Sequence, residues 1–375
     1  MKLCSVAMVA NESDIIEAFA RHTLAFTDHL HIGFHNSYDT TRDIIERLVD
    51  EGLSISHELI DTPAFRRERL GCELVQKAAA RGRFDYILPL DADEFIAVAG
   101  RKVLEAEFAA APAEGALSVT WLSYVSTRDD DPADPNPVTR IRHRLATPHP
   151  WVCKVFFRGD LMRRFDDIIL ADGNHSLLSR HGREIPERRA EQVHLAHYPV
   201  RSAAQLSSKA VLGALGRQLS PEFTDQQSRH WRALMADPAL AEGYSTEQLT
   251  QVTSRYLGAS ESPLVDAPLA FSGGALRYTD LIRVNPFARL VRYLAVVVKA
   301  GVLRPIEAGP DAGGGDTITV SAAEHRRLVT ELDIARRRVQ ELYQERARWR
   351  LRVYMPGAGA VVLLVLIHLL LGWYR

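Results

Sequence analysis

The sequence YILPLDADEF, residues 86–95, places a short apolar run directly before three carboxylates. Asp91 and Asp93 stand two positions apart, so their side chains would share one face of an extended segment. Carboxylates this close repel each other unless a cation lies between them, and a divalent ion with oxygen ligands meets that need. The carboxyl end of a buried strand is also where open α/β sheets bind their ligands. The stretch therefore predicts a metal–nucleotide site, with a solvated acidic loop as the alternative.

The chain that leads to this stretch alternates between strand-like and helical patterns. The strand-like runs are residues 3–10, 30–35, 53–59 and 84–90, and the helical runs between them are 14–26, 41–51 and 66–81. Units of this spacing are typical of an α/β fold with a mostly parallel sheet flanked by helices. After residue 94 the pattern is looser. Residues 116–122 and 151–157 are predicted strands around a Pro/Asp-rich loop, and residues 202–256 are predicted to be mainly helical.

Composition is that of a globular protein with an attachment. The 375 residues are 46% hydrophobic and 25% charged, and the net charge is −1, so no overall positive field indicates nucleic acid as a partner. Cys4, Cys72 and Cys153 are scattered and show no metal-ligand spacing. We expect buried, reduced thiols, which suit a reducing compartment.

The C-terminal end carries a candidate membrane anchor. Residues 357–374 read GAGAVVLLVLIHLLLGWY, long enough to cross a bilayer with the apolar residues just before them. Arginines crowd residues 346–352 on one flank, against a lone Arg375 on the other. The positive-inside rule then predicts a single-pass anchor at residues 355–375 with the N-terminal body in the cytoplasm. A buried core helix is the alternative. At the other end, the apolar run at residues 3–10 is too short for an export signal or a spanning helix.

Three further segments separate the body from this anchor. Residues 216–304 form a predicted helical extension, in which 284–303 could lie in the membrane surface or be a core helix with exposed cations. Residues 305–320 are a Gly/Pro-rich linker. Residues 321–354 open with a capping-box pattern and repeat apolar positions in steps of three and four. We expect a coiled-coil-like helix there, able to pair two or more chains or to lie against the body.

Several short blocks, in order, resemble one family. VANE at residues 9–12, FHNSYD at 34–39, DADEF at 91–95, WVCKV at 151–155, GNH at 173–175 and HYPVRS at 197–202, followed by Lys209, are similar to blocks of the GT-A glycosyltransferases. Within that fold they resemble the family 2 and family 92-like group. The resemblance covers about residues 1–215, which we take as the glycosyltransferase domain. It implies transfer of a sugar from a nucleotide-sugar donor, with Mn²⁺ or Mg²⁺ neutralising the departing diphosphate.

The resemblance also implies roles for individual residues. Asp93 would bind the metal and Asp91 the metal or the ribose, while Asn11 and Glu12 border the donor pocket. Asp39 would bond the nucleoside, although residues 36–39 also fit a plain turn that caps the next helix.

Each of the remaining candidate site residues has more than one possible role. His197 would be a third metal or diphosphate ligand, or a structural histidine. Lys154, with Arg158, would steady the diphosphate, or be a cation at the edge of a buried strand. Asp172 would be the general base of an inverting transfer, in competition with Asp166 and Asp167. Glu94 would stiffen the acidic turn or touch the acceptor, which makes it the second catalytic candidate.

The sequence thus predicts a membrane-anchored, metal-dependent glycosyltransferase. Its acceptor would be a hydroxyl of a glycan or a lipid-linked sugar, in surface glycan or polysaccharide synthesis. One alternative is a nucleotidyltransferase with a similar acidic site, although residues 6–12 lack the Gly-rich phosphate loop usual there. Another is a non-catalytic membrane scaffold built on the coiled coil.

Overall fold

A computed structural model describes residues 1–35, 37–60, 67–147, 153–165, 167–218, 234, 237, 239–257 and 262–284. The chain divides into two compact units, residues 1–304 and 305–375. The predicted linker, coiled-coil-like helix and anchor all fall in the second unit, which lies outside the described residues. Residues 285–303 of the first unit are also outside the described residues. Among the residues that are described, no helix combines the length and apolar character needed to cross a membrane.

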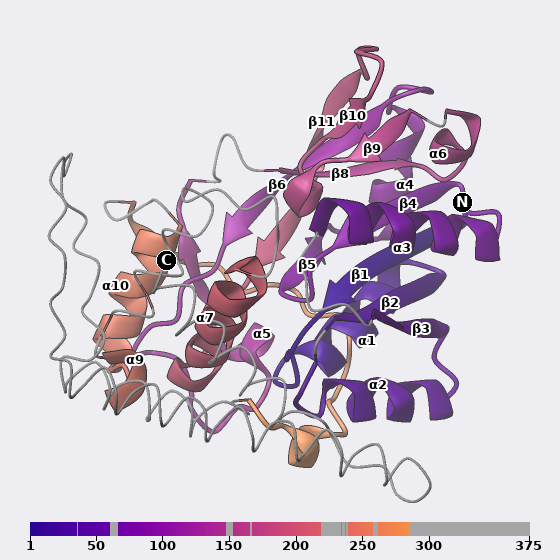
Figure 1. The fold of residues 1–375 in the computed structure, drawn as a ribbon. Coiled ribbons are helices and arrows are strands. Elements are labelled where there is room, and N and C mark those ends of the chain that lie inside the picture. The colour runs from indigo at the N-terminus through magenta and orange to yellow at the C-terminus, as the bar shows by residue number, and fades with distance from the viewer. Residues whose placement is uncertain are drawn as a thin grey trace, which may run out of the picture. The chain divides into compact units, whose positions relative to one another are not determined.

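The centre of the first unit is an eight-stranded sheet (Figure 1). In spatial order its strands are β3 (Ile55–Ile60), β2 (His29–His35), β1 (Leu3–Val9), β4 (Tyr86–Leu90), β8 (Cys153–Arg158), β6 (Ala116–Ser123), β11 (Glu187–His197) and β5 (Glu94–Ala97). The first four are parallel to one another, and β6 and β11 are also parallel, whereas β8 and β5 pair antiparallel with their neighbours. The expected mostly parallel sheet is therefore confirmed.

Helices cover both faces of the sheet, so the central strands β1, β2 and β4 are buried almost throughout, whereas β3 and the first part of β11 are more exposed. Residues of α1 (Ile16–Phe26), α2 (Thr41–Asp50) and α4 (Arg101–Ala109) share one core with the sheet. Residues of α3 (Arg67–Arg81) and α6 (Leu161–Arg164) share a second core with the sheet, and Cys4 and Phe157 belong to it. The predicted alternation through residue 90 is confirmed to within two residues at each boundary.

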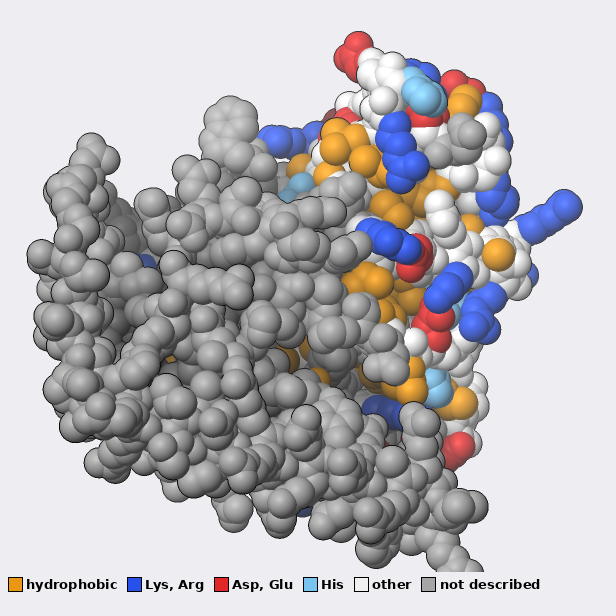
Figure 2. All heavy atoms as spheres, in the orientation of Figure 1, with side chains coloured by type: hydrophobic (Ala, Val, Ile, Leu, Met, Phe, Trp, Pro, Cys, Tyr) orange, Lys and Arg blue, Asp and Glu red, His pale blue; other side chains and the backbone are white. Residues whose placement is uncertain are grey.

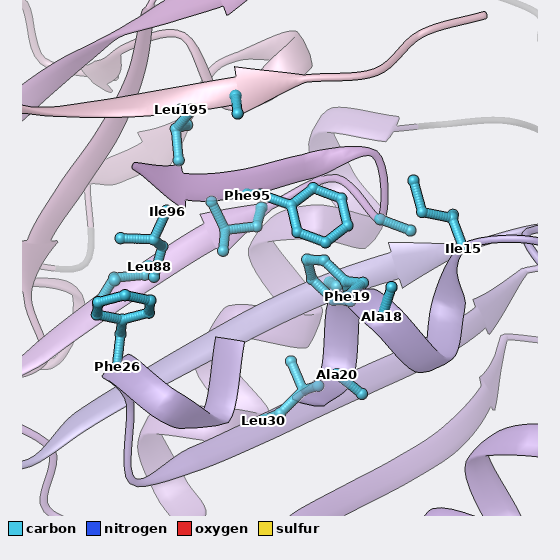
Figure 3. Packing of buried hydrophobic residues seen from close by; sticks show 14 of the residues in the cluster. Ile15, Ala18, Phe19, Ala20, Phe26, Leu30, Leu88, Phe95, Ile96 and Leu195 are labelled. Atoms are coloured by element: carbon cyan, nitrogen blue, oxygen red, sulfur yellow. The ribbon is translucent and has the colours of Figure 1, made fainter. Parts of the chain in front are cut away.

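The first core locks the acidic turn in place through Phe95, the residue that follows Glu94. Phe95 is fully buried and meets Phe19 of α1 edge to face, with ring centroids 6.1 Å apart. Tyr198, just after β11, packs on its other side at 5.5 Å. Figure 3 shows Phe19 and Phe95 facing each other between α1 and the strands, with Leu88 and Ile96 alongside. Removing a buried Phe side chain costs about 3–5 kcal/mol, so this packing fixes where the turn can lie.

Further elements, some of them short, complete the described part of the first unit. They are α5 (Pro137–Arg140), β7 (His143–Leu145), β9 (Ile168–Leu170), η1 (Asp172–Asn174), β10 (Leu177–Ser179), α7 (Ala203–Gln218), α9 (Ala239–Glu242), α10 (Thr246–Tyr256), β12 (Leu264–Asp266) and η2 (Thr279–Leu281). The three helices between residues 203 and 256 agree with the helical prediction for that region, although residues 219–233 lie outside the described part. The patterns did not indicate α4 or the short strands β5, β7, β9, β10 and β12.

Residues 262–284, here called the return segment, run back to the first two helices. The carboxylate of Glu17 on α1 accepts hydrogen bonds from the backbone N–H groups of Arg277 and Tyr278, at 2.7 and 2.9 Å. Further along, the N–H of Arg283 donates to Ser13 Oγ at 3.1 Å, and Thr40 Oγ1 donates to the carbonyl of Leu281. Figure 1 shows η2 at the end of this segment near α2. The segment therefore joins the loops that follow β1 and β2.

The surface and the thiols complete the description. Figure 2 shows basic side chains beside acidic ones on the described part of the visible face. Among the described residues, Lys77 and Glu58 form an ion pair at 2.6 Å. No disulfide joins the three cysteines, all of which are described. Cys4 is buried as expected, but Cys72 and Cys153 are only half-buried.

Candidate active site

The candidate site lies at the carboxyl ends of β1 and β4. β1 pairs with β2 on one side and with β4 on the other, so the chain leaves the centre of the sheet in both directions from β1. Open α/β sheets bind their ligands at such a switch point. Asn11 follows β1 and Asp91 follows β4, while β11 ends at His197 on the same edge, since β11 and β6 run in the direction of β4. The acidic cluster thus lies at the strand end predicted for it.

The acidic turn is closed by two reciprocal hydrogen bonds. The N–H of Glu94 donates to the carbonyl of Asp91 at 3.0 Å, and the N–H of Asp91 donates to Glu94 Oε2 at 3.0 Å. Glu94 is fully buried, whereas the Asp91 side chain keeps 22% of its surface exposed. Burial raises the pKa of Glu94 to about 8, although Lys154 opposes the shift. The geometry fits the predicted stiffening role of Glu94, and its contact with an acceptor stays a prediction.

Two lysines neutralise the aspartates of this turn. Lys154 Nζ, from β8, lies 2.8 Å from Asp91 Oδ2 and 3.2 Å from Glu94 Oε1. Lys209 Nζ, from α7, lies 2.7 Å from Asp93 Oδ2 and also donates to the carbonyl of Pro199. Burial is the largest single effect on Asp93 and raises its pKa, but Lys209 and the other positive groups around it together outweigh burial and lower the pKa to about 2. The two carboxylates are therefore held apart, each beside its own cation.

Lys154 and Arg158 separate in space, although they are on one strand. Lys154 is fully buried, which excludes the alternative that it reaches out to solvent from the edge of the sheet. Arg158 pairs with Tyr86 at the start of β4, at the opposite edge of the sheet from Asp91, and forms an exposed ion pair with Asp160 at 3.4 Å. Of the two cations, the structure brings only Lys154 to the site.

Arg201 connects the three segments of the site, and the sequence did not single it out. Its guanidinium is fully buried and holds both carboxylate oxygens of Asp14 at 2.8 Å, with Glu12 Oε2 at 2.5 Å. Asp93 Oδ2 lies 4.0 Å away. Burial alone would lower the pKa of Arg201, but Asp14 and Glu12 raise it above its ordinary value. For Glu12, burial outweighs Arg201 and raises the pKa to about 7.

Asn11 and Asp39 fasten the loops after β1 and β2 to each other. Asn11, in the left-handed region at φ 54°, accepts hydrogen bonds from the N–H groups of Tyr38 and Asp39 at 2.6 and 3.1 Å. Asp39 Oδ2 accepts from the N–H of Ser13 at 3.0 Å, and Oδ1 accepts from the N–H of Thr41, the first residue of α2, at 2.9 Å. The carboxylate thus does what the capping alternative proposed. A bond from Asp39 to a nucleoside stays a prediction.

His197 lies between Asp93 and an aromatic side chain. Its Nε2 is 3.8 Å from Asp93 Oδ1, and its ring stacks on Trp121 of β6 with centroids 4.1 Å apart. Burial lowers the pKa of His197 to about 4, so the imidazole is neutral near pH 7. Trp121 also meets His175 edge-on at 5.7 Å, and Lys154 Nζ lies 5.8 Å from its ring centroid. Trp121 and Lys209 complete the site, and neither carried a predicted role.

The candidates for a base occupy different places. Asp172 opens η1, a turn in which Gly173 takes φ 74°, and the neighbouring His175 Nδ1 bonds the carbonyl of Cys153 at 2.6 Å. This turn therefore lies beside β8, although the Asp172 side chain is outside the described part. Asp167 is buried in the β9–β10 hairpin, where Ser179 Oγ donates to it and Arg183 lies 3.7 Å away. Asp166 is not among the described residues.

A small pocket adjoins Asp91 on the α3 side of the sheet. It holds about 20 Å³, room for a water-sized group, and Asp91 and Asn174 are the polar residues of its lining. Val6, Met8 and Leu74 are among its apolar walls. A small apolar pocket that opens beside a carboxylate could border a larger ligand that lies over the carboxyl ends of the strands.

Two properties of the site bear on the binding of a divalent ion: the side chains able to coordinate it and the net charge around it. Within the described ranges, no group of three or more His, Cys, Asp or Glu side chains could hold a metal ion. Asp93 and His197 nevertheless offer two donors, and Mg²⁺-type ions commonly complete their shell with water and phosphate oxygens. The carboxylates of the site are those of Glu12, Asp14, Asp91, Asp93 and Glu94, and its permanent cations are Lys154, Lys209 and Arg201. Five against three leaves a net negative charge when all are ionised, and the raised pKa values of Glu94 and Glu12 reduce that charge near neutral pH unless a further cation is bound. The residues present fit such an ion.

Comparison with known proteins gives no family assignment. No protein-family model matches this chain, and no curated protein matches it. Similar solved structures include residues 1–349 of TarS from S. aureus, at 12% identity and a TM-score of 0.30, covering 84% of this chain and 100% of that one. The mannosyltransferase PcManGT from Pyrobaculum calidifontis, in complex with GDP-Man and Mn²⁺, is 12% identical with a TM-score of 0.35, covering 80% of this chain and 86% of that one. Glucosyl-3-phosphoglycerate synthase from Mycobacterium tuberculosis is 17% identical with a TM-score of 0.23, covering 32% and 43%. At such scores these similarities carry no argument about the fold or activity of this chain.

Proposed function

We propose that this protein is a metal-dependent glycosyltransferase with a GT-A type domain, which moves a sugar from a nucleotide-sugar donor to a hydroxyl acceptor. One observation carries the proposal. Asp91, Asp93, Lys154, Lys209 and Arg201 come from distant segments and meet at the carboxyl ends of β1 and β4. Such an assembly of carboxylates and cations at a ligand-binding edge suits a substrate that carries a diphosphate. The ordered sequence blocks that resemble this group support the same assignment.

The donor would lie across the loops that follow β1 and β4. Asn11 and Glu12 border it on the β1 side, and the Asn11 amide Nδ2 is buried without a hydrogen-bond partner, so it has a bond to offer. Asp91 is the most exposed carboxylate of the acidic turn, and it would take the ribose or the metal. The small pocket beside Asp91 would lie at the rim of the bound donor, with room for one water-sized group.

Asp93 and His197 would hold the divalent ion, Mn²⁺ or Mg²⁺. When bound, the ion supplies Lewis-acid neutralisation of the charge that grows on the departing diphosphate. Lys154 and Lys209 add two fixed positive charges within 3 Å of the aspartates, so they would bind diphosphate oxygens that come to the same edge. Arg201 holds the carboxylates of Glu12 and Asp14 in place beside Asp93 before any substrate arrives.

Transfer also needs a base that takes the proton of the acceptor hydroxyl, and inversion at the sugar carbon would follow from direct attack by that hydroxyl. We assign this role to Asp172, because its turn lies beside β8 and contributes Asn174 to the pocket at Asp91. Asp167 is a weaker candidate, since Ser179 and Arg183 already engage its carboxylate. Glu94 is also a weaker candidate, since it is fully buried inside the acidic turn.

The cellular setting belongs to the same proposal. A single-pass anchor at residues 355–375 would hold the domain on the cytoplasmic side of a membrane, where a glycan or lipid-linked acceptor for surface polysaccharide is within reach. Residues 321–354 would pair chains. A protein of this kind should remain in the membrane fraction after an alkaline carbonate wash, and release by that wash would exclude the spanning segment.

The deciding experiment compares Asp93→Asn with Asp50→Asn, an exposed aspartate at the end of α2. Nucleotide sugars are first screened with Mn²⁺ for a rise in Tm of the wild type, since a bound ligand stabilises the folded protein. Asp93→Asn should stay folded and lose metal-dependent turnover of the donor, whereas Asp50→Asn should behave as the wild type. Wild-type turnover by folded Asp93→Asn would exclude the catalytic-metal assignment.

The same assay separates the alternatives. A nucleotidyltransferase would consume a nucleoside triphosphate and a sugar phosphate and release pyrophosphate, whereas the proposed enzyme releases a nucleoside diphosphate. A scaffold would bind no nucleotide sugar with any divalent ion.

A further inference from the structure

Trp121 and His197, whose rings are in contact next to the acidic turn, each carry a buried polar atom without a hydrogen-bond partner. Their rings stack with centroids 4.1 Å apart and planes inclined by 33°. Trp121 Nε1 and His197 Nδ1 are both buried, and neither has a hydrogen-bond partner in the described structure. A buried polar group without a partner destabilises the folded protein, so two of them on rings in contact are unlike ordinary core packing.

The chemistry of the two atoms limits what can bind them. The indole N–H is a donor only, so its partner must be an acceptor oxygen or nitrogen. His197 directs Nε2 toward Asp93 Oδ1 at 3.8 Å, and a neutral imidazole that faces a metal through Nε2 carries its hydrogen on Nδ1. The pair then presents two donors. Because His197 covers one face of the indole, the ligand would meet the nitrogen-bearing edges of the rings.

The position of the pair indicates which part of a substrate it would meet. His197 links it to Asp93, and Lys154 Nζ, 5.8 Å from the indole centroid, lies 2.8 Å from Asp91 Oδ2. His197 thus connects the pair to Asp93, and Lys154 connects it to Asp91. The diphosphate would lie beside these two aspartates. The group attached to the outer phosphate of a nucleotide sugar is the sugar ring, whose neighbouring hydroxyl oxygens are close enough to accept from two adjacent donors.

We infer that Trp121 Nε1 and His197 Nδ1 form a subsite for two neighbouring hydroxyls of the transferred sugar, an assignment that rests on the proposed function. The subsite would distinguish a nucleotide sugar from the nucleoside diphosphate that remains after transfer. It therefore supports donor binding while leaving the product free to dissociate.

The experiment measures two dissociation constants, for the nucleotide sugar that most raises the wild-type Tm and for the matching nucleoside diphosphate, both with Mn²⁺. Trp121→Phe keeps an aromatic ring against His197 and removes the N–H. This variant should bind the nucleotide sugar about three- to tenfold more weakly, which corresponds to the loss of one neutral hydrogen bond. Its affinity for the nucleoside diphosphate should be unchanged. Tyr86→Phe is the control, because it removes a buried hydrogen bond to the carbonyl of Phe108 at the far end of β4.

Other outcomes would overturn the inference. An equal loss of affinity for both ligands would mean that Trp121 has a structural role. No loss of affinity for either would mean that the indole N–H donates to water and not to the sugar. Unchanged binding with impaired transfer would move Trp121 to the acceptor. Nucleotide sugars lacking one ring hydroxyl give a test that needs no variant to fold: one such compound should bind the wild type about three- to tenfold more weakly. A wild type that binds neither ligand would instead refute the proposed function.

Discussion

Lowering the pH should loosen the return segment through His22, a fully buried histidine of α1. The Nε2–H of His22 donates to the carbonyl of Ile96 at 2.8 Å, while Nδ1 accepts the N–H of Ser272 at 3.1 Å. Phe271 stacks on the ring at 5.6 Å. These partners require the neutral imidazole, because a proton on Nδ1 would point at another N–H.

The size and sign of the effect follow from the shift in pKa. Burial lowers the pKa of His22 from 6.5 to about 4, against the opposing effect of its bond to Ile96. The unfolded chain takes up a proton as the pH falls below about 6.5, and the folded protein does so only near 4. Folding stability is therefore lost between these values, by about 3 kcal/mol at the acid end, and is unaffected above them.

His22→Gln isolates this contribution, since a glutamine amide can donate to Ile96 and accept from Ser272 without titrating. Urea unfolding of both proteins from about pH 8 to about pH 4.5 should give similar stabilities at the upper end and a flatter decline for the variant. Differences at about pH 8 should stay below about 1 kcal/mol, the scale of one neutral hydrogen bond. Parallel pH profiles for the two proteins would refute the assignment of the neutral tautomer.

Three further predictions concern the site and the anchor. Asp172→Asn should lower acceptor transfer about a hundredfold or more while calorimetry with Mn²⁺ shows unchanged donor affinity, and lost donor binding would place Asp172 in the nucleotide pocket instead. Arg201→Met should cost about 3–5 kcal/mol in urea unfolding because it leaves buried carboxylates unpaired, against less than about 1 kcal/mol for Arg158→Met at an exposed ion pair. Deleting residues 315–375 should release a soluble domain, and its recovery in the membrane fraction would shift the membrane contact to residues 284–303.

The first half of the sheet could be predicted because its central strands β1, β2 and β4 are buried on both faces and the strands alternate with amphipathic helices. The acidic turn could be predicted because Asp91, Asp93 and Glu94 are neighbours in sequence, and local spacing is what a pattern records. Elements with weak local signals were missed. Helix α4 buries few side chains, among them Leu104 and Phe108, and β5 is only four residues long and begins inside the acidic cluster.

The rest of the site depends on distant contacts that spacing does not record. Lys209 pairs with Asp93 across 116 residues, and Arg201 reaches Asp14 across 187. Trp121 had no motif around it at all. Asp39 was ambiguous for a different reason: the same carboxylate after a strand can cap the following helix or bind a ligand, and only its hydrogen bonds show that it caps.

The return segment has a consequence for how the protein is made. The bond between Ser13 and Arg283 joins residues 270 positions apart, so the ribosome must deliver nearly the whole body before the loop after β1 receives its last partner. Contacts of such separation form late and slowly. A fragment ending after β11 would contain all the candidate carboxylates, yet Ser13 and Thr40 would lack the backbone groups that hold them. During synthesis from the N-terminus, the strands of the sheet would therefore be available first. The loops after β1 and β2 would receive their last partners only when the return segment has been made.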